Sequence, residues 1–377
     1  MICKLADICY YVKGKIDVGA LDENTYISTE NMLPNKEGVT TAASLPPTEQ
    51  TQAFSTNDVL VSNIRPYFKK LWQAEYDGGC SNDVLVLRAS ENCDSTYLYY
   101  VLANDAFFDY AMATSKGTKM PRGDKRAIME YAVPMIDIRS QQKIGKFLRC
   151  IDKKIVINKK INDNLQQQTL AIFQQELLRD GELPEGWSSG SLLDVANYLN
   201  GLAMQKYRPA DGENGLPVLK IKELRQGCCD ASSELCSPNI KPEYIVHDGD
   251  VIFSWSGSLL VDLWCGGTCG LNQHLFKVTS EKYPKWFYYA WTAHHLARFV
   301  AIAADKATTM GHIKREELAK AEVVIPDAAS MERIGGIMQP MYDLIISNRI
   351  ENRKLAALRD TVLPQLMSGE LDISDLT

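Results

Sequence analysis

The segment IGKFLRCIDKKIVINKKINDNLQQQTLAIFQQELL, residues 144–178, places apolar side chains at alternating steps of four and three residues. Such a seam predicts a helix that packs along a second helix. The same steps recur from Ile334, and asparagine interrupts both seams twice. Two matched helices, each after a globular segment, predict a coiled coil that holds two similar units apart. The seam positions are Ile144, Leu148, Ile151, Ile155, Asn158, Asn162 and Leu165, and then Ile334, Met338, Met341, Ile345, Asn348, Asn352 and Leu355.

The asparagines in the two seams allow two interpretations. They face outward and bind a partner, or they hydrogen-bond to one another, because a buried polar seam residue fixes register at some cost in stability. Since the same pair occurs in both helices, we favour mutual hydrogen bonding. Replacing Asn162 and Asn352 together with leucine is then expected to keep or raise thermal stability while loosening the orientation of the helices.

The duplication extends through the globular segments, which we call the first and second repeat. Leu5-Ala6-Asp7-Ile8 matches Leu192-Leu193-Asp194-Val195, and Asn57–Ser62 matches Gly249–Ser254. Each repeat has short β-type runs, then an aromatic helix, a polar loop and a last short strand. The expected strands are 58–62, 84–87, 133–134, 250–254, 275–278 and 323–326, and the expected aromatic helices are 97–110 and 286–300.

The predicted fold is α+β. Two duplicated small β-rich α/β units are joined by two long antiparallel coiled-coil helices in a pseudo-twofold and cyclic layout. We expect Ser140 and Ser330 to cap the helix N-termini and Pro364 to bend the second helix. The predicted bounds are 1–138 for the first repeat, 139–181 for the first helix, 182–327 for the second repeat and 328–377 for the second helix.

The composition of the 377 residues, 45% hydrophobic and 23% charged, is that of an ordinary soluble globular protein. The sequence has no apolar run of about 18 residues and no signal-peptide pattern at its start, so we expect a cytoplasmic protein. Its net charge of −6 means that any DNA contact must come from local basic clusters. The irregular spacing of its ten cysteines favours reduced, buried thiols over a zinc site.

The lead-in Leu183-Pro184-Glu185-Gly186-Trp187 and the closing run LRDTVLPQLMSGE, residues 358–370, carry a family resemblance. With two variable repeats and two long helices, the chain resembles the specificity subunit of Type I restriction–modification systems over nearly its whole length. The first repeat departs from this pattern, because it lacks the Leu-Pro-x-Gly-Trp lead-in. The resemblance implies that each repeat is a target-recognition domain that reads one half of a split sequence in double-stranded DNA.

The same resemblance implies partners and cofactors. The helices set the spacing between the half-sites and dock two methyltransferase subunits, and restriction subunits join complexes that cleave DNA. S-adenosylmethionine, and ATP with Mg²⁺ for restriction, would bind to those partners, and no cofactor is expected in this chain. The lone Pro46-Pro47 lacks the flanking residues of a methyltransferase loop, and glycine-rich nucleotide-binding motifs are missing. We expect a non-catalytic subunit; a coiled-coil scaffold without DNA readout and a catalytic DNA-modifying enzyme are the alternatives.

Basic loops are the best candidates for DNA contact, because phosphates and base edges attract Lys, Arg and hydroxyl side chains. One such loop, 116–126, recurs as 306–315. A second group follows strand 58–62 and differs from its counterpart, as expected for different half-sites. A third group lies in the second repeat, where ordinary surface charge is the favoured interpretation. The predicted DNA-binding residues are Arg65, Tyr67, Lys69, Lys70, Lys116, Thr118, Lys119, Arg122, Lys125, Lys206, Tyr207, Arg208, Lys220, Lys222, Trp255, Ser256, Lys306, Thr308, Thr309, His312 and Lys314.

Overall fold

The computed structural model describes residues 2–117, 119–178, 181–305, 313–368 and 370–371. By its contacts the chain divides into two compact units. The first unit comprises residues 1–154 and 355–377, and the second comprises residues 155–354. The two long helices are α4 (Ile138–Leu177) and α10 (Ala328–Ser368), and each helix contributes one segment to the first unit and one to the second.

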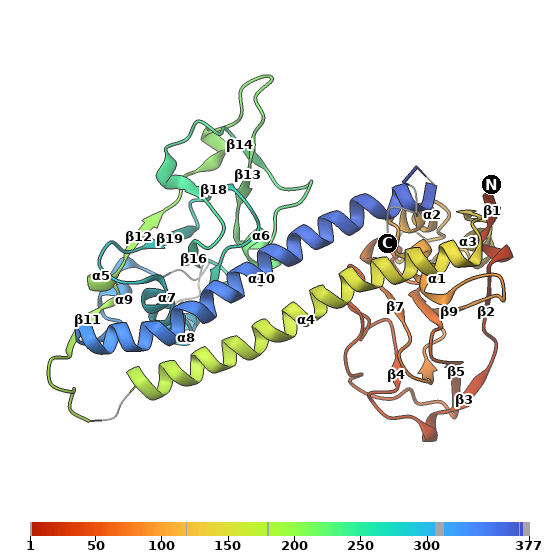
Figure 1. Cartoon of the computed structure of the whole chain (residues 1–377), viewed down its shortest axis with the longest axis horizontal. Helices are drawn as coiled ribbons and strands as arrows, with labels where there is room; N and C mark the ends of the chain where they lie inside the picture. Colours follow the sequence, from red (N-terminus) through yellow and green to blue (C-terminus); the bar gives the residue numbers. More distant parts are fainter. Residues whose placement is uncertain (1, 118, 179–180, 306–312, 369, 372–377) are drawn as a thin grey trace. The chain divides into compact units, whose positions relative to one another are not determined.

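The first unit contains two four-stranded sheets, with the strand orders β2-β9-β6-β7 and β3-β5-β8-β4, and a separate pair of β1 with β10 (Figure 1). All of these pairs are antiparallel except β4 with β8. The elements are β1 (Ile2–Lys4), η1 (Leu5–Asp7), β2 (Cys9–Tyr11), β3 (Lys15–Asp17), η2 (Val18–Ala20), β4 (Tyr26–Ile27), β5 (Gln50–Phe54), β6 (Val59–Ser62), η3 (Pro66–Phe68), β7 (Leu71–Gln73), β8 (Gly78–Cys80), β9 (Val84–Ala89), α1 (Ser95–Ala103), α2 (Asp105–Ala113), α3 (Lys125–Met129) and β10 (Ala132–Pro134).

The second unit repeats the sheet β2-β9-β6-β7 as β12-β19-β16-β17 and the separate pair as β11 with β20. The other sheet differs at one edge: in the first unit β3 pairs with β5, which is antiparallel to β8, whereas in β14-β13-β18-β15 of the second unit β14 pairs with β13, which is parallel to β18. The elements of the second unit confirm the duplicated α+β fold that the sequence predicted. They are β11 (Ser188–Ser191), α5 (Leu192–Val195), β12 (Asn197–Asn200), η4 (Met204–Lys206), β13 (Leu216–Leu219), α6 (Ile221–Gln226), β14 (Leu235–Cys236), η5 (Pro242–Tyr244), β15 (Ile245–Val246), β16 (Val251–Ser254), β17 (Leu260–Leu263), β18 (Cys269–Leu271), β19 (Leu275–Thr279), α7 (Lys285–His294), α8 (Leu296–Asp305), α9 (Arg315–Ala319) and β20 (Glu322–Ile325).

The central strands have apolar side chains on both faces. In β6, Val59 and Val61 belong to the core that includes α1 and α2, whereas Leu60 belongs to a separate core on the other face. This follows from the two-residue period of a strand, which sends alternate side chains to opposite faces. In β16, Val251 and Ile252 are divided between two cores in the same way. Continuous apolar runs therefore formed the middle strands of both units.

The end of each long helix packs into the unit that begins next in the repeat pattern. Phe173 and Leu177 near the end of α4 lie in the same core as Leu192. Leu363 and Met367, at the equivalent positions of α10, lie in the same core as Leu5. The end of α4 therefore completes the core of the second unit, and the end of α10 completes the core of the first unit. This is the arrangement that a cyclic repeat predicts.

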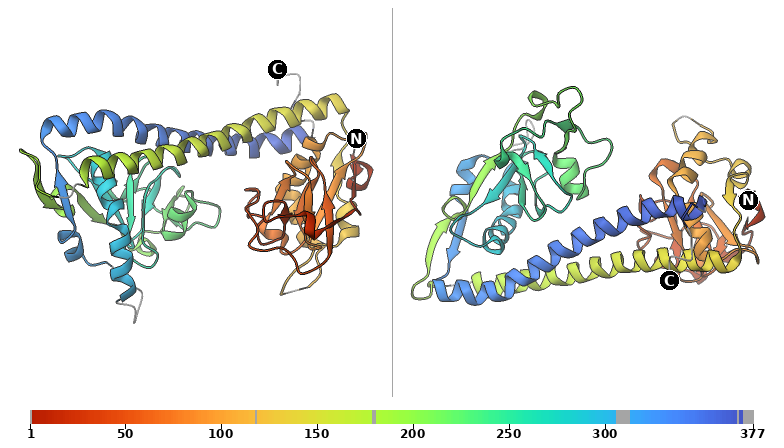
Figure 2. Two further views of the ribbon diagram at one scale, coloured as in Figure 1. Left: turned by 90° about the horizontal axis from the view of Figure 1, so that it is seen from below. Right: turned by 45° about the horizontal axis from the view of Figure 1, so that its top comes forward.

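The two long helices run antiparallel where they pack together within each unit (Figure 2). In the second unit, Asn158 donates from Nδ2 to Asn352 Oδ1 over 2.9 Å, and Asn348 donates from Nδ2 to Asn162 Oδ1 over 2.9 Å. These are the mutual hydrogen bonds that the repeated asparagines predicted. Every seam position named from the sequence, from Ile144 to Leu165 and from Ile334 to Leu355, is buried or half-buried.

Two local predictions were wrong. Each aromatic helix is two helices, because Asn104 and His295 interrupt it, and the Asn104 side chain accepts from the Ala106 N–H as the cap of α2. The long helices begin earlier than Ser140 and Ser330, because the preceding carboxylates of Asp137 and Asp327 accept from the N–H groups of those serines. Helix α10 continues through Pro364 to Ser368, with the buried side chains of Leu363 and Leu366 around the proline, and the bend expected at Pro364 stays a prediction.

Candidate nucleic-acid interface

Two loops predicted separately from the sequence meet in the first unit. The segment after β6 and the basic segment before α3 are joined by backbone hydrogen bonds from Arg65 N–H to Pro121 O (2.8 Å) and from Gly123 N–H to Asn63 O (3.1 Å). Ile64 and Arg122 form an isolated β-bridge between them. Residues 63–70, 115–117 and 119–126 therefore make one surface, to which both groups of candidate side chains belong.

The basic segment contributes exposed cations to this surface. Lys119 and Lys125 are exposed and have no ion pair with any described residue. Lys116 pairs with Asp124 at 2.5 Å, and Arg122 pairs with Asp83 at 3.1 Å. The Lys116 ammonium, helped by two backbone N–H groups at the start of α3, lowers the pKa of Asp124 to about 2. These exposed pairs are weakly held and leave the cations accessible; Thr118 lies outside the described residues.

Two lysines after β6 are engaged within the unit. Lys69 pairs with Asp105 on α2 at 2.8 Å, and Lys70 donates to the Thr29 carbonyl over 2.6 Å. Partial burial lowers the pKa of Lys70. Arg65 and Tyr67, by contrast, are exposed. Sequence composition made the four side chains look equivalent, and the fold divides them into two that hold the loop and two that face solvent.

The second unit builds the same junction with different side chains. Ile313 N–H donates to Trp255 O over 2.9 Å, as Gly123 donates to Asn63. Ser62 and Ser254, which end the equivalent strands, donate from their hydroxyls to the carbonyls of Ile64 and Ser256. The serines were not predicted as part of the site, although their equivalent positions in the two repeats were a visible signal.

Two predicted DNA-binding side chains of the second junction, those of Trp255 and Ser256, are half-buried and buried. The indole N–H of Trp255 donates to Asn200 Oδ1 over 3.0 Å, and its ring lies 5.6 Å from that of Phe276. Ser256 is buried, whereas Lys314 is exposed at the start of α9. The remaining candidates of this loop, Lys306, Thr308, Thr309 and His312, lie outside the described residues.

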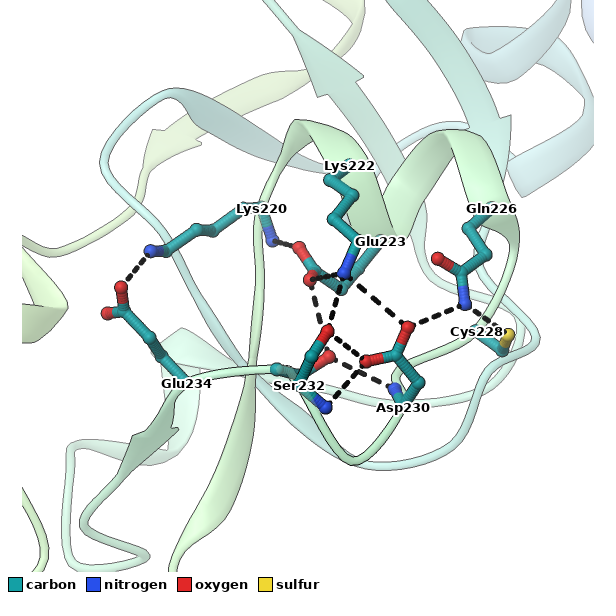
Figure 3. Close-up of polar contacts among 9 residues, drawn as sticks. Lys220, Lys222, Glu223, Gln226, Cys228, Asp230, Ser232 and Glu234 are labelled. Carbon is teal, nitrogen blue, oxygen red and sulfur yellow. Dashed lines mark hydrogen bonds and ion pairs between the residues drawn. The ribbon is translucent and has the colours of Figure 1, made fainter. Parts of the chain in front are cut away.

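The third group surrounds α6, close to this junction. A Cβ on Gly257 would lie 3.7 Å from the Ile221 side chain, which places the Trp255 loop beside the start of α6. Lys220 pairs with Glu234 at 2.6 Å, and Lys222 donates to the Ser232 hydroxyl over 2.7 Å (Figure 3). Lys222 also approaches Asp230 at 3.4 Å. Neighbouring acids thus neutralise both lysines, and a role of Lys220 and Lys222 in DNA contact stays a prediction.

Basic residues from η4 join the same patch. Lys206, Tyr207 and Arg208 are exposed, and Arg208 contributes with the Lys220 ammonium to lowering the pKa of Glu234. Hydrogen bonds from the Ser232 hydroxyl and the Gln226 amide similarly lower the pKa of Asp230. In each unit the candidate segments therefore converge on one surface, and each surface contains both cations and hydrogen-bonding groups.

Other kinds of site received no support within the described residues. No three of their His, Cys, Asp or Glu side chains are arranged to hold a metal ion, and all ten cysteines are free thiols. None of the helices described has the length and hydropathy needed to cross a membrane.

Comparisons with known proteins agree with this arrangement. A family model described as the Type I restriction modification DNA specificity domain matches residues 1–167 and 184–358. The MjaIX specificity subunit of Methanocaldococcus jannaschii is 25% identical, covering 75% of this chain and 70% of that protein. The MjaVIII specificity subunit of the same organism is 21% identical, covering 100% and 93%. A solved Type I restriction–modification S subunit from M. genitalium has a similar fold, with 14% identity, coverage of 97% and 96%, and a TM-score of 0.59.

Proposed function

The chain belongs to the Type I restriction modification DNA specificity family, and we propose that it is the DNA sequence-specificity subunit of such a complex. One observation carries the proposal: both units build the same backbone junction and place different side chains on it. Gly123 with Asn63 and Ile313 with Trp255 make equivalent hydrogen bonds. A fixed backbone with variable side chains suits two domains that read different half-sites by the same docking geometry.

The side chains of each junction match the chemistry of duplex DNA. Exposed cations such as Lys119 and Lys125 attract phosphates without regard to sequence. Arg65 in the first unit and Tyr207 and Arg208 in the second are exposed and would be the candidates for base contact, since arginine pairs with guanine and apolar groups contact the thymine methyl. Since the chain has a net charge of −6, partner subunits contribute part of the phosphate contact in this proposal.

Apolar side chains exposed on the long helices support docking of partner subunits. Val156, Ile157 and Leu170 on α4, and Ile337 and Leu344 on α10, are 45–55% exposed. Exposed apolar residues that recur along helices are typical of an interface with another protein. We propose that two methyltransferase subunits cover these faces, with restriction subunits joining in complexes that cleave DNA. S-adenosylmethionine, and ATP with Mg²⁺, would be bound by those partners in the cytoplasm, and this chain would supply recognition without catalysis.

The proposed domain bounds follow from the repeat. Residues 1–138 and 182–327 are the two target-recognition domains, and residues 139–181 and 328–377 are the spacer helices. The described helices span Ile138–Leu177 and Ala328–Ser368. These bounds define the segments to exchange in a functional test.

The test is a domain exchange in the assembled complex. The chain is co-expressed with its neighbouring methyltransferase, and methylated adenines are mapped across a genome. We expect a bipartite motif. Replacing residues 182–327 with the corresponding domain of a relative should change one half of the motif and leave the other half unchanged.

Three results would contradict the proposal. A motif that stays the same after the exchange would show that this domain does not read DNA. A chain that forms its complex but directs no sequence-specific methylation would instead be a coiled-coil scaffold. Methylation by the purified chain alone would identify it as a catalytic protein.

A further inference from the structure

The turn after β6 in the first unit exposes two adjacent aromatic rings. Tyr67 and Phe68, in η3, are 49% and 38% exposed, and their ring centroids lie 4.6 Å apart. Aromatic side chains normally contribute to stability by burying their surface. A neighbouring pair left in solvent therefore indicates a surface that is covered when a partner binds.

The backbone around these rings adopts a costly conformation. Arg65 and Lys69, on either side of η3, have left-handed φ angles of 50° and 51°. Asn35 and Lys36 in the adjoining loop also have positive φ angles, of 55° and 63°. Left-handed residues other than glycine persist where their surroundings hold them, and they concentrate at functional positions. Here they raise the aromatic pair on a short, tight turn.

Contacts with neighbouring segments hold the turn in place. Asn35 N–H donates to Phe68 O, and Lys36 N–H donates to Lys69 O, each over 2.9 Å. The Asp105 carboxylate binds the ammonium groups of Lys36 (2.9 Å) and Lys69 (2.8 Å). The aromatic pair is therefore ordered before binding, which lowers the entropy cost of using it as a contact.

Charge around the turn identifies the partner. The exposed Arg65 guanidinium has no ion pair with any described residue. Its backbone N–H donates to Pro121 O, which places the basic segment with Lys119 and Arg122 directly beside the turn. Apolar rings flanked by cations complement a polyanion that offers flat apolar surfaces between its charged edges, as stacked base pairs do.

Resting on the proposed function, we propose that Tyr67 is a wedge that enters a base step of the half-site read by the first unit. Phe68 supports the ring from behind, and the neighbouring cations bind the flanking phosphates. Apolar wedges partly unstack a base step and bend the duplex. Because pyrimidine–purine steps unstack most easily, the step entered is expected to be TA or CA.

The second unit lacks this device between the corresponding strands β16 and β17, where residues 255–259 include a single aromatic residue, Trp255, the counterpart of Asn63. The ring of Trp255 is half-buried, with its indole N–H bonded to Asn200 and its face near Phe276. We therefore expect the DNA to be distorted only in the half-site that the first unit reads, at the base step that Tyr67 enters.

The test uses permanganate, which oxidises thymines that are unstacked. The chain in complex with its methyltransferase subunits is bound to a duplex that carries the mapped target. Thymines opposite the methylated adenines are left out of the comparison, because flipping of those adenines exposes them in both half-sites. We expect further thymine reactivity at a single base step, in the half-site of the first unit.

Three variants test whether the thymine reactivity depends on the ring of Tyr67. Tyr67→Ala should abolish this reactivity and weaken target binding about tenfold, the loss expected for one stacked aromatic contact. Tyr67→Phe keeps the ring and should restore both. Tyr10→Ala removes another aromatic of the same unit, 48% exposed on β2, and should change neither. The melting temperature of Tyr67→Ala should stay at the wild-type value, because the hydrogen bonds of the turn come from its backbone.

Each contrary result overturns the wedge. A complex that methylates its motif but shows no Tyr67-dependent reactivity would contradict the wedge and leave the proposed function intact. If replacing one thymine with uracil reproduces the effect of Tyr67→Ala on binding without any unstacking, Tyr67 contacts a thymine methyl group instead. A complex without sequence-specific binding would contradict the proposed function as well.

Discussion

At the scale of single residues, the asparagines of the long helices show how buried polar side chains pair across a helix seam. Asn162 and Asn348 are 6% and 7% exposed and hydrogen-bond to each other. Asn158 is fully buried and donates to both Asn352 and Glu351. The antiparallel direction makes Asn162 the partner of Asn348, so a double replacement of Asn162 and Asn352 would break both pairs instead of removing one.

The structure therefore changes the variant that tests these asparagines. Asn162→Leu alone leaves the buried amide of Asn348 without its acceptor and should lower the free energy of unfolding by about 1–3 kcal/mol. Asn162→Leu with Asn348→Leu removes both polar groups and should restore stability to near or above the wild-type value. Urea denaturation followed by circular dichroism measures both variants. If the double variant has the same low free energy of unfolding as the single variant, the asparagines stabilise the helix pair by more than their mutual hydrogen bond.

At the scale of elements, the two long helices approach the aromatic helices through matched glycines. Gly145 in α4 and Gly335 in α10 occupy equivalent positions in the two repeats. A Cβ at Gly145 would lie 3.2 Å from the Thr96 side chain, and one at Gly335 would lie 2.9 Å from Nε1 of the buried Trp286. Glycine therefore allows each long helix to lie close to α1 or α7, which positions the helix against its recognition unit.

Adjacent glycines provide a controlled test of this contact. Gly335→Ala forces a methyl group against an indole that cannot move freely and should destabilise the chain by about 1–3 kcal/mol, less the gain in helix propensity. A Cβ at Gly336, on the same helix, would meet no described atom within 4 Å, so Gly336→Ala should stabilise by about 0.5–1 kcal/mol. Thermal unfolding compares the melting temperatures of Gly335→Ala and Gly336→Ala with that of the wild type. Equal stabilisation by the two alanines would rule out the close approach.

At the scale of the whole molecule, the proposed function makes the long helices a spacer. Inserting one heptad between Asn158 and Asn162, together with one between Asn348 and Asn352, adds about 10.5 Å of helix while nearly keeping its rotational phase. At about 3.4 Å per base pair, the gap in the bipartite target should lengthen by about three base pairs. Methylation mapping with the assembled complex measures the number of base pairs between the two half-sites.

A mismatched insertion is the control for the spacer prediction. A heptad added to α4 alone shifts the asparagine pairs out of register, and we expect it to impair assembly and methylation. A matched insertion that leaves the gap unchanged, with methylation intact, would show that the helices do not set the distance between the half-sites.

The candidate surfaces were predictable in outline but not in their details. Recurrence of basic loops in the two repeats pointed to the segments around Lys116 and Lys314. The same reasoning could not show that Lys69 is held by Asp105, or that Lys70 is held by the Thr29 carbonyl, because these partners are distant in the sequence. Exposure of Phe68 beside Tyr67 was likewise invisible, since an aromatic run in sequence normally indicates core.

The sequence by itself determined the duplicated order of elements, the central strands and the two long helices. These depend on local periodicity, on turn-forming residues and on an internal duplication, all of which can be read along the chain. Tertiary structure decided which asparagines pair, which loops meet and which cations stay exposed. Those outcomes depend on contacts between segments that are distant in the sequence. The geometry of such contacts is set by how helices and sheets pack, and a local sequence pattern does not encode that packing.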